Sequence, residues 1–95
     1  MVPDLSQIKT IEKYTTKKDQ DRTIYYKDDK AFLVVNNHTI EVRCDDKLSQ
    51  HLQEQYESVM ESRYFGRGGI EIVPTNQLSP QEIEDLIALS YTLTD

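Results

Sequence analysis

Residues 23–44, TIYYKDDKAFLVVNNHTIEVRC, carry the pattern that decides the predicted fold. Three short runs rich in β-branched and aromatic residues are separated by Asp28 and Asp29 and then by Asn36 and Asn37. Asn and Asp tolerate the left-handed backbone that two-residue turns require. The segment therefore predicts two β-hairpins in series, which together form a three-stranded meander.

Placing each turn at the centre of its hairpin gives the strand register. The predicted partners are Tyr26 with Ala31, Ile24 with Leu33, Leu33 with Ile40, and Ala31 with Val42. Because side chains alternate between the two faces of a strand, these residues are expected to share the face that meets the helices. The opposite face then gathers Thr23, Tyr25, Phe32, Val34, Thr39 and Glu41.

A helix and a fourth strand are expected after the meander. Asp45 or Asp46 is predicted to cap a helix that ends near Ser62. Its apolar stripe consists of Leu48, Leu52, Tyr56, Val59 and Met60. Residues 65–69 predict a flexible turn, and residues 70–73 predict a strand with Ile70 and Ile72 inward, which Pro74 ends.

The clearest local signal is a second helix near the C-terminus. Ser79 stands at the N-cap, Pro80 at the first helical position and Glu82 at the third, which is a full capping box. The inward stripe of this helix consists of Ile83, Leu86, Ile87 and Tyr91. The order of elements predicts an α+β fold: an antiparallel sheet, made of the three-stranded meander plus a later strand, with two helices packed on one face.

The first 22 residues give weaker signals. Residues 4–14 fit either a short helix or a strand, and both alternatives stay open. Residues 17–22 contain no apolar side chain, which is typical of a loop.

Composition indicates one domain over residues 1–95, with 37% hydrophobic and 29% charged residues. The longest apolar run, residues 31–35, is far shorter than the roughly 20 residues of a membrane span. One cysteine excludes an internal disulfide, and one cysteine with two histidines cannot complete a four-ligand zinc site. We therefore expect a cytoplasmic protein that does not contact membranes and holds no cofactor or metal.

Four stretches between residues 24 and 93 follow one another in a recognisable order. They are the apolar strand with a turn at residues 31–35, the strand end Val42, Arg43, Cys44 and Asp45, the Leu-rich helix through Gln55 and Tyr56, and the helix from Pro80 to Ser90 and Tyr91. In these stretches the chain resembles the MmcQ/YjbR-like family of small bacterial proteins. The resemblance implies an α+β fold and, through the label commonly given to that family by fold analogy, DNA binding. Family members usually carry an Asn-Lys pair and a Trp where this chain has residues 64–69, YFGRGG.

Two binding surfaces are predicted, and both belong to a non-enzymatic module. Tyr25, Phe32 and Val34 form an aromatic face that is expected to bind a protein partner or a second copy of the chain. The alternative is a nucleic-acid surface made by Lys17, Lys18, Arg22, Arg63 and Arg67. The net charge of −6 disfavours the alternative, because nucleic-acid affinity comes from cations that neutralise phosphates.

No arrangement of residues supports catalysis in this sequence. A nucleophile or acid with an orienting base is required, and neither a Ser-His-Asp spacing nor paired catalytic carboxylates can be assigned. Cys44 is expected to be a packed core thiol, with a pKa raised by its acidic neighbours Asp45 and Asp46.

Overall fold

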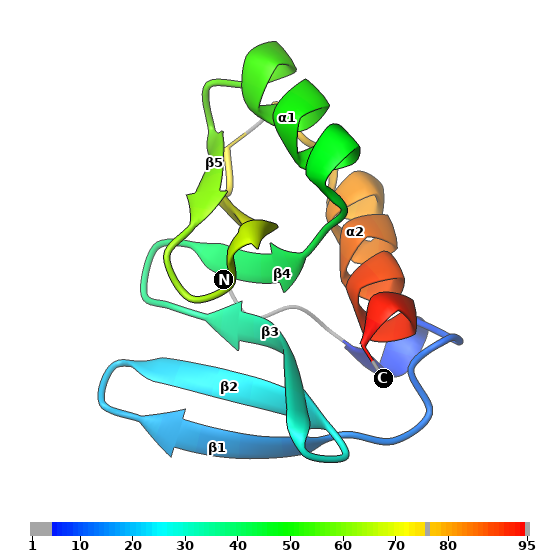
Figure 1. The fold of residues 1–95 in the computed structure, drawn as a ribbon. Helices are drawn as coiled ribbons and strands as arrows, with labels where there is room; N and C mark the ends of the chain where they lie inside the picture. The colour runs from blue at the N-terminus through cyan, green and yellow to red at the C-terminus, as the bar shows by residue number, and fades with distance from the viewer. Residues whose placement is uncertain (1–4, 76, 95) are drawn as a thin grey trace.

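The computed structural model describes residues 5–75 and 77–94 (Figure 1). In chain order its elements are the 3₁₀-helix η1 (Leu5–Gln7), β1 (Thr15–Asp19), β2 (Arg22–Lys27), β3 (Lys30–Val35), β4 (Ile40–Arg43), α1 (Asp46–Gln55), β5 (Val59–Ser62), β6 (Gly66–Ile72) and α2 (Pro80–Leu93). The strands form one six-stranded sheet in the order β1-β2-β3-β4-β6-β5, and every neighbouring pair is antiparallel. The α+β prediction is therefore confirmed.

Both helices pack on the same face of the sheet, as predicted (Figure 1). Helix α1 contacts β5 and β6, whereas α2 contacts β3 and β4. The main core lies between the helices and the sheet, and its fully buried side chains include Phe32, Leu33, Val42, Ile70, Ile72 and Ile87. The other face of the sheet, which carries no helix, is called the helix-free face below.

The start of α2 matches its sequence signal. The Ser79 hydroxyl accepts a hydrogen bond from the backbone N–H of Glu82, and the Glu82 carboxylate accepts one from the backbone N–H of Ser79. This reciprocal pair satisfies two donors that the first turn of a helix otherwise leaves open. Ile83, Ile87 and Tyr91 are buried along the inward side of the helix.

A β-bulge in β3 makes part of the predicted register wrong. Tyr26 lies opposite Ala31, as predicted, but the next partners are Tyr25 and Leu33, so Phe32 is an extra residue in β3. A bulge of this kind cannot be read from a turn-centred register, because it changes the pairing by one residue after the turn. Phe32 and Leu33 both join the core under the helices.

The bulge moves several side chains to the face opposite to the predicted one. Ile24 lies opposite Val34 instead of Leu33, because a one-residue slip turns every later side chain over. Ile24, Ala31 and Val34 form a second, small cluster on the helix-free face, and Tyr26 packs against it. Tyr25 packs against the main core instead.

The turn between β3 and β4 lies one residue later than predicted. The backbone N–H of Asn36 donates to the carbonyl oxygen of Thr39 at 2.8 Å, so residues 37–38 are at the centre. The observed partners are Leu33 with Val42 and Val35 with Ile40, which replace the predicted pairs of Leu33 with Ile40 and Ala31 with Val42. Because this register shift is two residues, the inward direction of Ile40 and Val42 is still as predicted.

Residues 17–22 form the turn end of the β-hairpin made by β1 and β2, so the predicted loop is wrong. Strands β1 and β2 are joined at Gln20 and Asp21, and Gln20 adopts a positive φ of 57°. Strand β1 is the first strand of the sheet and is almost entirely exposed, so its side chains show no apolar alternation. Residues 8–14 form neither a helix nor a strand, although Leu5, Ile8 and Ile11 are buried in the main core.

Helix α1 is shorter than predicted. Asp45 is its N-cap, as expected, but the helix ends at Gln55, and Val59–Ser62 forms the edge strand β5. Val59 and Met60 fit a helical stripe by spacing, yet they alternate across a strand: Val59 is buried in the main core and Met60 is exposed.

Strand β6 begins at Gly66, within the predicted flexible turn. Gly66 has a positive φ of 64°, which glycine adopts without strain. A Cβ at Gly69 would lie 2.6 Å from the Cβ of Phe65 and 2.6 Å from the carbonyl oxygen of Val42. The absence of a side chain at Gly69 therefore lets residues 63–65 fold closely over the helix-free face.

Candidate functional site

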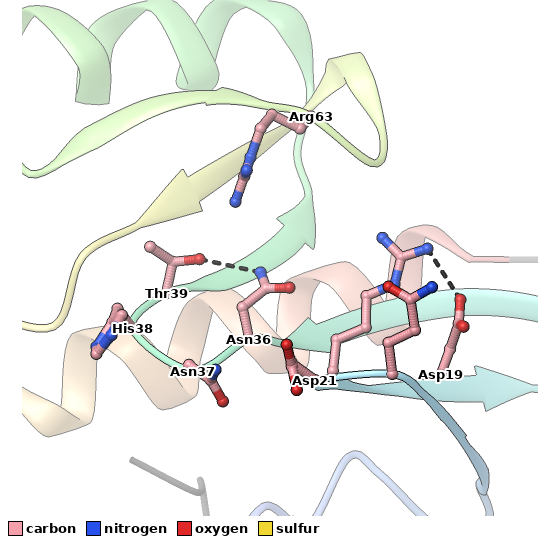
Figure 2. A pocket seen from close by; sticks show the side chains of 9 residues that line it. Asp19, Asp21, Asn36, Asn37, His38, Thr39 and Arg63 are labelled. Carbon is pink, nitrogen blue, oxygen red and sulfur yellow. Dashed lines mark hydrogen bonds and ion pairs between the residues drawn. The ribbon is translucent and has the colours of Figure 1, made fainter.

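A hollow of about 500 Å³ opens on the helix-free face (Figure 2). Its walls come from the turn between β1 and β2, the turn between β3 and β4, and the link between β5 and β6. The lining residues are Asp19, Gln20, Asp21, Arg22, Asn36, Asn37, His38, Thr39 and Arg63. Its size is within the range of small-molecule sites, whereas its lining is polar throughout.

Two buried carboxylates lie side by side behind this hollow. Glu41 on β4 is the direct cross-strand partner of Glu71 on β6, and the two residues are 2% and 1% exposed. Like charges in this arrangement repel each other, and each buried carboxylate requires donors to replace water. The surrounding turns supply those donors.

Glu41 accepts three hydrogen bonds from two separate parts of the chain. The donors are the Ser62 hydroxyl at 2.8 Å, the backbone N–H of Tyr64 at 2.9 Å and the amide Nδ2 of Asn36 at 2.9 Å. The carboxylate therefore ties the β5–β6 link and the β3–β4 turn to the middle of the sheet.

Glu71 is held by Arg63 and Thr39. Arg63 donates from Nε at 2.9 Å and from Nη2 at 2.7 Å, which is a bidentate pair, and the Thr39 hydroxyl donates at 2.7 Å. Burial raises the pKa of Glu71, but the hydrogen bonds and charge of Arg63 and the hydrogen bond of Thr39 outweigh it, so the pKa lies below its ordinary value. Glu71 is thus held in its charged form.

Arg63 is anchored at one edge and open at the other. Its side chain is 77% exposed although its carboxylate partner is buried. Figure 2 shows Arg63 extending from the β5–β6 link toward Thr39 and Asn36, and the Arg63 guanidinium and the Thr39 hydroxyl both donate to Oε2 of Glu71. Because Nε and Nη2 face Glu71, the remaining N–H groups of the guanidinium are the ones available to a ligand.

Asn36 also has a fixed orientation. Its Nδ2 donates to both Glu41 and the Thr39 hydroxyl, each at 2.9 Å. The Thr39 hydroxyl donates its hydrogen bond to Glu71, so its oxygen accepts the hydrogen bond from Asn36. Both amide hydrogens of Asn36 are therefore used, and the group that it can offer to a ligand is its carbonyl oxygen.

The three arginines of the predicted nucleic-acid surface all form ion pairs. Arg22 bonds to Asp19 at 3.1 Å, Arg63 bonds to Glu71, and Arg67 bonds to Asp46 at 3.4 Å. The structure brings Arg22 and Arg63 to the same hollow, whereas Arg67 lies on β6, bonds to Asp46 at the start of α1 and does not line the hollow.

The remaining members of that predicted surface are Lys17 and Lys18, which lie exposed on β1. Arg22 also lies over the ring of Tyr64, with 5.3 Å between its guanidinium carbon and the ring centroid. An arginine stacked on a half-exposed aromatic ring is a feature of nucleic-acid surfaces, but here a carboxylate already engages the same arginine.

The predicted aromatic face is wrong, because its side chains are buried within the chain. Phe32 and Val34 are both 0% exposed, and Tyr25 is half-buried. The bulge turns Tyr25 and Phe32 toward the helices, where the Phe32 ring packs edge-on against Tyr91 with 5.0 Å between centroids. Tyr14 from the N-terminal segment packs against Tyr25.

Val34 points to the helix-free face, yet it too is inaccessible. It lies in the small cluster with Ile24 and Ala31, against which Phe65 packs. The guanidinium of Arg43 lies over the Phe65 ring, 4.9 Å from its centroid. No surface with the predicted composition therefore exists among the described residues.

Glu41 and Glu71 are the site residues that sequence reasoning missed. Both stand at the centre of near-identical triplets, Ile40-Glu41-Val42 and Ile70-Glu71-Ile72. A charged residue between two inward apolar residues is ordinarily read as solvent-facing. The recurrence of one triplet in two strands was the available signal that the carboxylates pair across the sheet.

The cysteine and the metal-ligating side chains of the described residues add no second candidate site. Cys44 is buried, and its burial, followed by the charge of Asp45, raises the pKa of its thiol to about 11, a rise in the predicted direction. In the described part of the chain, no group of three or more His, Cys, Asp and Glu side chains could hold a metal ion.

Within residues 5–75 and 77–94, neither helix has the length and apolar character needed to cross a membrane.

Comparison of the chain with protein-family models, with curated proteins and with solved structures finds no match. The resemblance to the MmcQ/YjbR-like family therefore stays a prediction.

Proposed function

We propose that this protein is a non-enzymatic binding module that holds a small polar ligand, bearing an acidic group, in the hollow on the helix-free face. The observation that carries the proposal is the placement of Arg63. Its guanidinium is fixed on one side by a buried carboxylate and presents its other side to a hollow of about 500 Å³.

Anchoring of this kind favours binding. A free arginine loses rotamer entropy when a ligand immobilises it, and the bidentate bond to Glu71 has already removed much of that freedom. Glu41 contributes indirectly, since it fixes the backbone of Tyr64 and the hydroxyl of Ser62 on either side of Arg63. The site is thus rigid before a ligand arrives.

The test is an NMR titration that follows the Nε–H signals of the arginine side chains. Acetate, inorganic phosphate and 4-aminobutanoate serve as probes, each raised to tens of millimolar. We expect at least one probe to shift the Arg63 signal along a saturating curve. If none of the three probes moves it, the proposal is wrong.

Two variants separate a specific site from a general effect of charge. Arg63→Lys keeps a cation beside Glu71 but loses the planar fork and the Nε–H reporter, so binding is followed in both proteins by the backbone N–H signals of Asn36 and Thr39. Any saturating shift of these signals in the wild type should disappear in the variant. Arg67→Ala is the matched control, because Arg67 is 79% exposed and ion-paired like Arg63 but lies outside the hollow. If both variants lower the affinity for the probe equally, the proposal is contradicted.

Nucleic-acid binding is the second candidate function, and one observation favours it. Lys17 and Lys18 are exposed on the edge strand β1, close in sequence to the Arg22 side chain that stacks on Tyr64. Affinity for single-stranded DNA that falls steeply with salt and is weakened by Lys17→Ala would support this function. The carboxylate partners of all three arginines argue against it.

A further inference from the structure

The charges around the hollow limit which ligand it can hold. Its lining contributes Arg22 and Arg63 against Asp19 and Asp21, and Glu41 and Glu71 lie buried directly behind Arg63. Four carboxylates thus face two guanidinium groups in the described part of the site. A ligand that carries only negative charge would be attracted by the two guanidinium groups and repelled by the four carboxylates.

The wall opposite Arg63 offers negative charge and acceptor atoms. Figure 2 shows Arg63 and Asp21 reaching into the hollow from opposite sides, with Asn36 between them. Asp19 is occupied by Arg22, whereas Asp21 has no ion-pair partner among the described residues. The carbonyl oxygen of Asn36, whose amide hydrogens are both used, adds an acceptor beside this carboxylate.

These two walls have complementary preferences. Arg63 supplies donors that suit a carboxylate or phosphate, and Asp21 with Asn36 supplies acceptors that suit an ammonium group. One molecule that carries both groups would satisfy each wall and would add no net charge to an acidic protein.

We infer that the ligand is a small zwitterion, with its acidic group on Arg63 and its ammonium group on Asp21 and the carbonyl oxygen of Asn36. This inference rests on the proposed function, because it assigns the ligand class of the same hollow.

The experiment compares three four-carbon probes in the NMR titration of the intact protein. 4-Aminobutanoate carries both charges, butanoate lacks the ammonium group and butylamine lacks the carboxylate. We expect 4-aminobutanoate to bind about fivefold more tightly than either single-charge probe, since one exposed charge pair contributes up to about 1 kcal/mol. Butanoate or butylamine binding as tightly as 4-aminobutanoate would overturn the inference.

A substitution of Asp21 tests the position of the ammonium group. Asp21→Asn should lower the affinity for 4-aminobutanoate to that for butanoate and leave the butanoate affinity unchanged or higher. Asp29→Asn is the control, because it removes the same charge at the exposed β2–β3 turn, outside the hollow. Equal effects of the two variants would show that only overall charge matters and would refute the assigned position.

The binding function and the ligand class are rejected by different results. Saturating binding of butanoate at Arg63 with no preference for the zwitterion would retain the binding module and reject the ligand class. The absence of saturating binding by every probe would reject both.

Discussion

Glu41 shows how much a single buried residue organises in this protein. Its carboxylate accepts hydrogen bonds from Ser62 at the end of β5, Tyr64 in the β5–β6 link and Asn36 at the β3–β4 turn. A buried donor that loses its acceptor costs about 1–3 kcal/mol. The hydrogen bonds around Glu41 therefore form a buried polar network on the helix-free face.

Replacement of this carboxylate should be costly. Glu41→Ala removes the shared acceptor of three donors, and we expect the free energy of unfolding in urea to fall by about 2–4 kcal/mol. Glu61→Ala is the control, because Glu61 is an exposed residue of β5. A loss no greater than that of Glu61→Ala would show that the network contributes little.

The pH dependence of stability should report on Glu71. Its folded-state pKa lies below the ordinary value of 4.5 because Arg63 and Thr39 outweigh the effect of burial. The folded protein therefore binds fewer protons than the unfolded chain in this region, so the stabilisation is complete above about pH 4.5 and is lost as the pH falls through the folded pKa.

Urea unfolding between pH 2 and pH 6 measures this effect. The wild-type protein should lose stability on acidification more steeply than Glu71→Gln, which has no proton to bind at this position. The comparison uses the slope with pH, because the substitution also changes the stability at neutral pH. Identical slopes for the two proteins would contradict the assigned pKa direction.

At the level of elements, Gly69 sets how closely the β5–β6 link approaches β4. A Cβ there would lie 2.6 Å from the backbone oxygen of Val42, which cannot move without disturbing the sheet. We expect Gly69→Ala to lower the free energy of unfolding by about 1–3 kcal/mol, the usual cost of an inserted methyl group in a packed site. Gly68 is the matched position, since a Cβ there meets only the Phe65 carbonyl oxygen at 3.7 Å.

Thermal and urea unfolding of both glycine variants check this prediction. Gly68→Ala should stay close to the wild type. If Gly69→Ala is equally well tolerated, then the link does not lie as close to β4 as the structure places it.

The elements also show which features the sequence determines locally. Helix α2 was predictable because its capping box, proline and apolar stripe lie within adjacent turns. The faces of β4 were predictable because Ile40 and Val42 alternate with polar residues. Strand β1 was not predictable as a strand, because an exposed edge strand of Thr and Lys has no apolar period.

The candidate site was less predictable than the fold, for a tertiary reason. The extra residue Phe32 turns over the faces of β2 relative to β3, and nothing near it in the sequence marks a bulge. Arg63 and Arg22 were singled out from the sequence, but their carboxylate partners and their meeting at one hollow depend on the order of β4, β6 and β5.

At the scale of the whole molecule, the two faces of the sheet have different kinds of cover. Two helices and the N-terminal segment bury one face, and the short link of residues 63–65 with its carboxylate network covers the other. Burial of aromatic side chains should therefore stabilise the fold mainly on the first face, whereas ligand binding should depend on the second.

Substitutions of one aromatic residue from each face test this division. Phe32 is fully buried against Tyr91, so Phe32→Ala should lower the free energy of unfolding by about 3–5 kcal/mol. Tyr64 is 39% exposed and its ring contacts the Arg22 guanidinium, so Tyr64→Ala should lower the free energy of unfolding by only about 1 kcal/mol. Urea unfolding and light scattering are measured on both variants. A stable Phe32→Ala protein with a smaller assembled mass would place Phe32 at an interface between copies and would contradict its burial within the chain.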